Sequence, residues 1–291
     1  MTTFDRHALL LGEEGRRILA EQTGVVVGLG GIGSVAAVEL AHSGFGSLIL
    51  VDHDILEESN RPRVIGSRPS DVENRVAKVE IARRYISESM PECNVRTYQT
   101  IVEDISIREE LIAADFIVIG TDSARSRAYV NEICHRYYVP ILDLGVEFVA
   151  TDGRLQNEVG KTNLIMPGTP CLWCSGHVSS EMILTEELPE HEVRKRAQEG
   201  YVRNIHIPQP SMMPFNGEIA SRGVQLLVLQ LSGLAPVQET IYEQRSFLGM
   251  NNRKAIRPVV KHHSDDCPFC TPGSVLGAGD SSPSIMKAIT V

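Results

Sequence analysis

The chain has 291 residues and a formal net charge of −9, from 28 lysines and arginines against 37 aspartates and glutamates. This acidic balance argues against general binding to nucleic acid, and the sequence shows neither an apolar run long enough to span a membrane nor an N-terminal signal peptide. We therefore expect a soluble cytoplasmic protein whose six cysteines stay reduced. The length suits one large α/β domain with additions or two small domains, and no repeat or linker separates two domains.

The first half of the chain alternates between predicted helices and predicted strands. A helix is expected at 7–22, with a break at its GEEG sequence, and another follows the glycines after residue 27. Further helices are predicted at 76–90, 107–113 and 123–137, and strands at 25–27, 48–51, 95–99, 115–120 and 139–144. This alternation predicts a Rossmann-like, doubly wound and mostly parallel α/β sheet, with a nucleotide-binding core at about residues 20–145.

The glycine-rich turn after the first strand is the strongest local signal. Its glycines are Gly28, Gly30, Gly31 and Gly33. Gly28 and Gly30 permit a sharp turn close to a ligand, Gly33 lets the next helix pack against the sheet, and the helix N-terminus offers N–H groups to phosphate. Asp52 follows Gly33 by 19 residues, where an acid accepts from ribose hydroxyls. A turn without a ligand is the alternative, but the strand, helix and acid together favour nucleotide binding.

The pattern changes after Gly145. Residues 146–150, 154–159 and 162–166 read as antiparallel strands with a turn at Asp152-Gly153, so we expect an antiparallel, zinc-binding extension over about 146–275. Residues 179–206 are charged and irregular, which predicts either a partner-facing loop or a solvated helix. An apolar helix is predicted at 217–231 and a strand at 239–247. The small, polar residues after Thr271 predict a loosely held end, and residues 276–291 a flexible tail.

Four of the six cysteines form two CxxC pairs separated by 92 residues: Cys171, Cys174, Cys267 and Cys270. Each pair can place two thiolates on one ion, and two pairs complete a tetrahedral zinc site. Because four cysteines fill the coordination sphere, the predicted zinc is structural. A redox CxxC or a coincidence is the alternative reading. Neither Cys93 nor Cys134 is expected to be a nucleophile. Cys134 lies on an apolar helix face, and Cys93 has few basic residues nearby that would lower its pKa.

Polar side chains gather where the predicted strands end. They are Asp52, Asn60, Arg61, Arg63 and Asp122, and Lys78 opens the helix after the loop. Cations beside a carboxylate suit a nucleoside triphosphate with Mg²⁺. A dehydrogenase would not require so many cations at this edge. Each residue alone reads as a solvated charge, and only their joint placement favours a site.

The ordered set of motifs resembles the ThiF/MoeB/HesA-type adenylyltransferases of the ubiquitin-activating-enzyme-like superfamily. The matching segments are Phe4-Asp5-Arg6, the glycine turn, Asp52-His53-Asp54, Ser59-Asn60-Arg61-Pro62-Arg63, Lys78, Thr121-Asp122 with Arg127 and Asn131, and the paired CxxC sequences. They run over nearly the whole chain. The resemblance implies a homodimer that uses ATP and Mg²⁺ to adenylate the C-terminal carboxylate of a ubiquitin-like or sulfur-carrier protein, or of a peptide.

The resemblance also implies roles for individual residues. Asp52 would hold the ribose, and the phosphates would be held by Asn60, Arg63 and Lys78. Asp122 would organise Mg²⁺ at the α-phosphate, and Arg6 would reach the triphosphate of the neighbouring subunit. The loop before Lys78 is longer than in many members.

Members that form a thioester carry a cysteine after the first CxxC, whereas residues 175–266 contain none. The acyl-adenylate would therefore pass to an external acceptor such as sulfide, an amine or a persulfide. Three alternatives stay open. The first is a related adenylating enzyme acting on a ribosomal peptide in natural-product maturation, a small molecule or an RNA base. The others are a NAD-binding oxidoreductase and a scaffold that binds ATP without turnover.

Overall fold

The computed structural model describes residues 3–151, 154–189, 192, 211–234, 241–245, 256–258 and 262–286. Within these residues lies an eight-stranded sheet of order β3-β2-β1-β4-β5-β6-β7-β8. Its strands are β1 (Thr23–Val27), β2 (Ser47–Val51), β3 (Asn94–Tyr98), β4 (Phe116–Ile119), β5 (Ile141–Thr151), β6 (Arg154–Ile165), β7 (Ile241–Arg245) and β8 (Ile256–Pro258). Neighbouring strands from β3 to β5 are parallel, and those from β5 to β8 are antiparallel. The predicted sheet class is confirmed.

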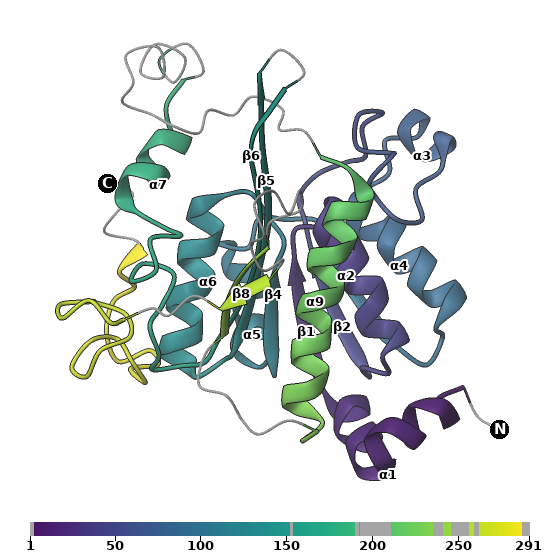
Figure 1. Cartoon of the computed structure of the whole chain (residues 1–291), viewed down its shortest axis with the longest axis horizontal. Helices are drawn as coiled ribbons and strands as arrows, with labels where there is room; N and C mark the ends of the chain where they lie inside the picture. Colours follow the sequence, from purple (N-terminus) through teal and green to yellow (C-terminus); the bar gives the residue numbers. More distant parts are fainter. Residues whose placement is uncertain are drawn as a thin grey trace.

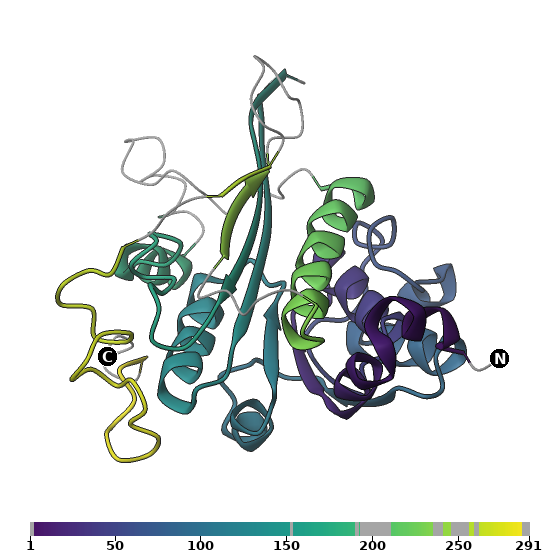
Figure 2. The ribbon, with the colours of Figure 1, turned by 60° about the horizontal axis from the view of Figure 1, so that its bottom comes forward.

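Helices cover both faces of the sheet (Figures 1 and 2). One face carries α2 (Gly31–His42), α4 (Lys78–Ser89) and α9 (Met213–Leu231), and the other carries α5 (Arg108–Ile112) and α6 (Ala124–Tyr137). The remaining elements are α1 (Asp5–Glu21), α3 (Pro69–Glu73), the 3₁₀ turn Ile105–Ile107 and α7 (Ser180–Glu186). Parallel strands covered on both faces must be apolar on both, which explains the unbroken valines of β1.

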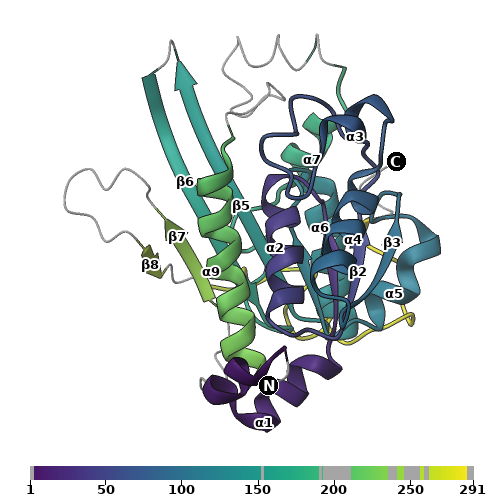
Figure 3. The ribbon, with the colours of Figure 1, turned by 90° about the vertical axis from the view of Figure 1, so that its right-hand side faces the viewer.

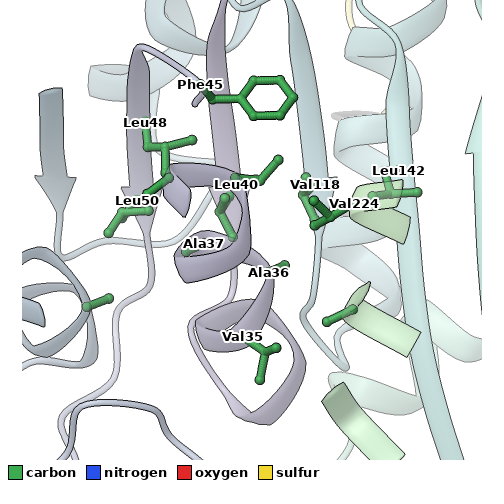
Figure 4. Packing of buried hydrophobic residues seen from close by; sticks show 14 of the residues in the cluster. Val35, Ala36, Ala37, Leu40, Phe45, Leu48, Leu50, Val118, Leu142 and Val224 are labelled. Atoms are coloured by element: carbon green, nitrogen blue, oxygen red, sulfur yellow. The ribbon is translucent and has the colours of Figure 1, made fainter. Parts of the chain in front are cut away.

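Helix α2 is the centre of the larger core. Its residues Val35, Ala36, Ala37 and Leu40 lie beside Leu48, Leu50, Val118 and Val224 (Figure 4). The helix is buried on most sides because it packs on the sheet and lies between α4 and α9 in the same layer (Figure 3). Small alanines let it approach its neighbours closely, so the N-terminus of α2 is held firmly against the end of β1.

The structure joins some of the strands that were predicted as separate. Residues 141–151 form the single strand β5, and residues 154–165 form β6, because Gly145 and Gly160 stay extended and pair within the ladder. These two strands run well beyond the parallel part of the sheet (Figure 3). Only Ile241–Arg245 of the strand predicted at 239–247 is described, and the predicted turn at 152–153 lies outside the described residues. The predicted break in the first helix is a kink at Gly12, whose φ is +68°.

The C-terminal segment, which was expected to be loosely held, is hydrogen-bonded to α6 as far as Met286. Glu132 and Arg136 form a buried ion pair of 2.8 Å on one side of this helix. The Glu132 carboxylate accepts the N–H groups of Ile285 and Met286, and Arg136 donates to the carbonyl groups of Gly279, Ser282 and Pro283. Residues 287–291 lie outside the described part of the chain. No helix that the structure describes has both the length and the apolar character needed to cross a bilayer.

Candidate active site

A cleft of about 1420 Å³ opens at the carboxyl ends of β1, β2 and β4 and beside the middle of β5. The chain leaves β1 and β4 in opposite directions across the sheet, and such a switch point is where open α/β sheets bind ligands. The cleft is lined by the glycine turn and by parts of the loops after β2, β3 and β4, together with Lys78, residues 143–147, Lys161, His177 and one side of α7.

The glycine turn has a geometry that only glycine permits at two positions. Gly28 has a φ of +84°, and a Cβ there would lie 2.8 Å from the backbone nitrogen of Thr121. A Cβ on Gly33 would lie 1.7 Å from the carbonyl oxygen of Gly28. Open space surrounds Gly30, which lines the cleft. No described side chain caps α2 at this end, so its first N–H groups are available to an anion.

Asp52 lies in the cleft wall between this turn and the loop after β2. Its Oδ2 accepts the N–H of Leu29 at 2.5 Å, and its Oδ1 accepts the N–H of Asp54 at 2.8 Å. Burial raises the pKa of Asp52, and nearby Lys78 opposes that rise. Each carboxylate oxygen keeps a further lone pair, so Asp52 can accept from a sugar hydroxyl while it holds the glycine turn.

The structure brings the predicted cations to the same place. Lys78 is only 8% exposed, and its Nζ donates to Oδ2 of Asp54 at 2.7 Å. Arg63 passes beside the start of α2, since its Cδ lies 3.4 Å from where a Cβ of Gly31 would stand. Arg63 and Asn60 both line the cleft, and Arg63 has no ion pair with any described residue. Positive charge therefore gathers around the N-terminus of α2.

A buried ion pair supports the loop that carries Arg63. Arg84 donates to both oxygens of Asp71 at 2.8 Å and to the carbonyl of Gly66 at 3.0 Å. Asp71 also accepts the N–H of Arg68 at 2.8 Å. The hydrogen bonds from Arg84 lower the pKa of Asp71 despite its burial. The pair fixes the end of the loop on α4.

Asp122 follows β4, and its exposed side chain lines the same cleft as the cations. Arg127 of α6 connects the segment that carries Asp122 to β5. Its Nη1 lies 3.4 Å from the Asp122 carbonyl oxygen, and its Nε donates to Oδ1 of Asp143 at 2.9 Å. Burial alone would raise the pKa of Asp143, but the charge of Arg127, with help from His177 and Asn163, holds it below its usual value. Asp122 itself stays available for a metal ion.

Some residues of the site were missed by sequence reasoning. They are Asp143, Lys161, His177 and Glu186, all of which line the cleft. Asp143 could have been found, because it stands near the end of a predicted parallel strand. His177 comes close only because the knuckle of the first CxxC pair folds against β6, where its Nδ1 lies 2.9 Å from Ser175 Oγ and 3.4 Å from Asn163 Nδ2.

Arg6 lies elsewhere. It is exposed on α1, at the end of the sheet where β1 begins, whereas the cleft opens at the other end of that strand (Figures 1 and 3). Arg6 does not line the cleft of its own chain. Any contact of this side chain with a nucleotide has to come from another subunit.

The four predicted zinc ligands meet at one point. Their sulfur atoms lie 3.8 Å apart for Cys171–Cys174, 3.6 Å for Cys171–Cys267 and 3.5 Å for Cys174–Cys270. Tetrahedral zinc with bonds of about 2.3 Å requires sulfur atoms about 3.8 Å apart, so the four thiolates fit this ion. The site also connects to α6, since Asn131 Oδ1 accepts the N–H of Leu172 at 3.0 Å. Zinc bound here would be structural.

Comparison with known proteins agrees with this geometry. The ThiF family matches residues 4–269, and the chain belongs to this family. It is 28% identical over 173 residues to the SAMP-activating enzyme E1 of Haloferax volcanii, covering 59% of this chain and 60% of that protein. It is 28% identical over 165 residues to the sulfur carrier protein ThiS adenylyltransferase of Bacillus subtilis, covering 56% of this chain and 46% of that protein. The chain thus spans about half of these relatives.

The fold is also similar to a solved structure. Escherichia coli MccB, crystallised with MccA-N7isoASN, superposes with a TM-score of 0.72 over 93% of this chain and 75% of that chain. Their sequences are 21% identical, so this likeness supports the fold alone.

Proposed function

We propose that the protein is an ATP- and Mg²⁺-dependent adenylyltransferase that activates the C-terminal carboxylate of a ubiquitin-like or sulfur-carrier protein, or of a peptide. The observation that carries the proposal is the composition of the cleft. The uncapped N-terminus of α2, the cations of Arg63 and Lys78 and the carboxylate of Asp122 all line the same cleft. Relatives named as carrier-protein adenylyltransferases support the same reaction.

Each part of the cleft has a task in this reaction. The N–H groups of α2, with Arg63, Asn60 and Lys78, neutralise and orient the phosphates. Asp52 accepts from the ribose hydroxyls. The Asp122 carboxylate is suited to hold Mg²⁺, and the bound ion would offset negative charge on the phosphate oxygens.

Adenylation requires little further chemistry from the protein. The substrate carboxylate is ionised at neutral pH and attacks the α-phosphorus directly. A P–O bond forms, the bond to the bridging oxygen of the β-phosphate breaks, and pyrophosphate leaves with that electron pair. Because no proton has to move, the rate depends on the position of the two reactants and on charge neutralisation.

The acyl-adenylate then passes to an acceptor that the chain does not supply. Residues 175–266 contain no cysteine. Cys93 and Cys134 are both buried outside the cleft, and burial raises the pKa of Cys93 to about 11 and that of Cys134 well above its usual value. Neither offers a thiolate, so an external nucleophile displaces AMP. A reaction that uses ATP and reduced thiols fits the cytoplasm.

We also propose that the enzyme is a homodimer in which Arg6 reaches the cleft of the partner subunit. The distance of α1 from the cleft of its own chain supports this arrangement, and the exposed Leu9 and Leu10 on the same helix offer apolar surface for a contact. A two-fold axis would make the exchange of Arg6 reciprocal.

Exchange of labelled pyrophosphate into ATP tests the proposal. Exchange should depend on Mg²⁺ and on a partner with a free C-terminus. Asp122→Ala should lower it by at least about a hundredfold while ATP affinity is largely kept, because the metal acts mainly in the transition state. Glu58→Ala is the matched control, since the only ion pair of this exposed acid with a described residue is that with Arg61, and neither residue lines the cleft. Normal exchange in Asp122→Ala would remove Asp122 from the mechanism.

A further inference from the structure

The last residue of α7, Glu186, binds the N-terminus of α6. Its carboxylate accepts from the hydroxyl of Ser123 at 3.0 Å, from the N–H of Arg125 at 3.2 Å and from the N–H of Ala124. An anion here satisfies N–H groups that a helix leaves unpaired and lies at the positive end of the helix dipole. Glu186 is thus a helix cap supplied from about 60 residues further along the chain.

The capped turn begins directly after Asp122. Within the turn, Ser123 donates its N–H to Thr121 Oγ1 at 3.2 Å and accepts from the N–H of Ser126 at 3.2 Å. These bonds are local, and among the described residues Asp122 itself is held only by the 3.4 Å contact of its carbonyl oxygen with Arg127. The bonds to Glu186 therefore link the turn that follows Asp122 to α7.

This cap also decides where phosphate can bind. Four of the described helices, α2, α4, α6 and α9, begin at or beside the cleft. The start of α6 already holds a carboxylate, whereas that of α2 is uncapped by any described side chain. A phosphate or a substrate carboxylate would be repelled by Glu186 at α6. The Glu186 carboxylate therefore disfavours an anion at the start of α6 and leaves the uncapped start of α2 available to one.

We propose that Glu186 is a positioning residue, which holds the Asp122 turn in the orientation that the metal-dependent step requires and couples it to α7. This inference rests on the proposed function. Helix α7 lines the cleft through Glu181, Met182 and Thr185, so a ligand that moves α7 also moves the Asp122 turn.

Hydrogen exchange tests the cap without any substrate. In Glu186→Gln, the amide groups of residues 123–126 should exchange about fivefold faster than in the wild type, the effect of losing one helix cap. Glu187→Gln is the matched control. This neighbouring acid pairs with the Arg125 guanidinium at 2.9 Å but, among the described residues, accepts no backbone N–H of the turn, so hydrogen exchange should be unchanged. Glu186→Asp keeps the charge and should recover part of the protection.

A Mn²⁺ spectrum then tests the positioning role, with Mn²⁺–ATP as the probe. The electron paramagnetic resonance spectrum of the enzyme–Mn²⁺–ATP complex should change in Glu186→Gln in the same direction as in Asp122→Ala, and the double variant should resemble Asp122→Ala alone.

The inference would be overturned if Glu186→Gln and Glu187→Gln gave equal hydrogen-exchange rates and equal spectra. A wild type that binds Mn²⁺–ATP but never exchanges pyrophosphate would overturn the proposed function instead. If Glu186→Gln does not fold, the wild type decides: Mg²⁺–ATP should slow exchange in residues 180–187, and unchanged exchange there contradicts the coupling.

Discussion

Lys78 donates a hydrogen bond of 2.7 Å from its Nζ to Oδ2 of Asp54, and its side chain is only 9% exposed. The pair holds the ammonium group at the edge of the cleft, beside the carboxylate of Asp52. Lys78 opens α4 with its backbone N–H bonded to the carbonyl of Asp54, so main chain and side chain are fixed by the same residue. We therefore expect the Lys78 ammonium group, which the family resemblance assigns to the phosphates, to contribute to ATP affinity.

Lys78→Met should weaken ATP affinity by about tenfold, because a charge-assisted hydrogen bond to phosphate is lost while the aliphatic stem stays packed. Asp54→Asn keeps the ammonium group and should change the affinity by less than about threefold. Calorimetric titration with ATP measures both. Equal affinities in Lys78→Met and the wild type would show that this lysine only pairs with Asp54.

Zinc should be present at about one ion per chain and should contribute to stability, since the four thiolates meet only in the folded state. Cys267→Ser should lower both the metal content and the melting temperature, the latter by more than about 5 °C. Ser264→Ala provides the control, because only its backbone N–H contacts Cys174 Sγ. Metal analysis of unchelated protein that finds far less than one zinc per chain would contradict the site.

The Asp71–Arg84 pair should make stability depend on acidic pH. Folding lowers the pKa of the Asp71 carboxyl, so the ionised group stabilises the folded state at neutral pH. This contribution is lost as the pH falls below the ordinary aspartate pKa of about 3.9. Asp71→Asn should lower the free energy of unfolding by about 2 kcal/mol at pH 7, because the charge-assisted hydrogen bonds from the partly exposed Arg84 are weakened. The difference from the wild type should shrink at pH 3.

Denaturant titrations at the two pH values measure this effect. The control is Glu88→Gln, whose exposed carboxylate lies 3.4 Å from Arg68, and its effect should stay below about 0.5 kcal/mol. A destabilisation by Asp71→Asn that is the same at pH 3 and pH 7 would exclude the ion pair as its cause.

Mixed dimers test whether Arg6 acts across an interface. Arg6→Ala and Asp122→Ala should each be nearly inactive alone. If Arg6 acts on the partner subunit, a mixed dimer has one site with both defects and one with neither, and it should recover about half of the wild-type activity per dimer. If Arg6 acts within its own chain, both sites are damaged and no activity returns. Co-expression with two different tags and purification on both gives the mixed species, and a mild loss in Arg6→Ala alone would indicate only a surface ion pair.

The residues that sequence reasoning found share a simple origin. Asp52 and Asp122 each follow a predicted strand of a parallel sheet, and strand order alone brings such positions to one edge. The glycine turn was equally readable, since its φ values and close contacts require glycine. The clustering of the four cysteines was predictable because two CxxC pairs leave few arrangements for four thiolates on one ion.

The residues that were missed depend on contacts between distant parts of the chain. Glu186 stands in a charged stretch that looks like solvated surface, and nothing local shows that it caps α6. The sequence of the tail from Gly277 to Met286 suggests an unstructured segment. In the structure, Glu132 and Arg136 form hydrogen bonds with its backbone. Composition describes what a segment prefers by itself, and these segments are ordered by a partner elsewhere in the fold.

Mass analysis of a captured partner tests the central proposal most directly. The enzyme is incubated with Mg²⁺, ATP and a cytoplasmic extract or peptide pool, and partners that gain AMP are sequenced. We expect AMP on the C-terminal carboxylate of one protein or peptide, with none formed by Asp122→Ala or after the C-terminus is amidated. AMP on an RNA base or a small molecule, or hydride transfer from NADH with no adenylation, would contradict the proposed reaction.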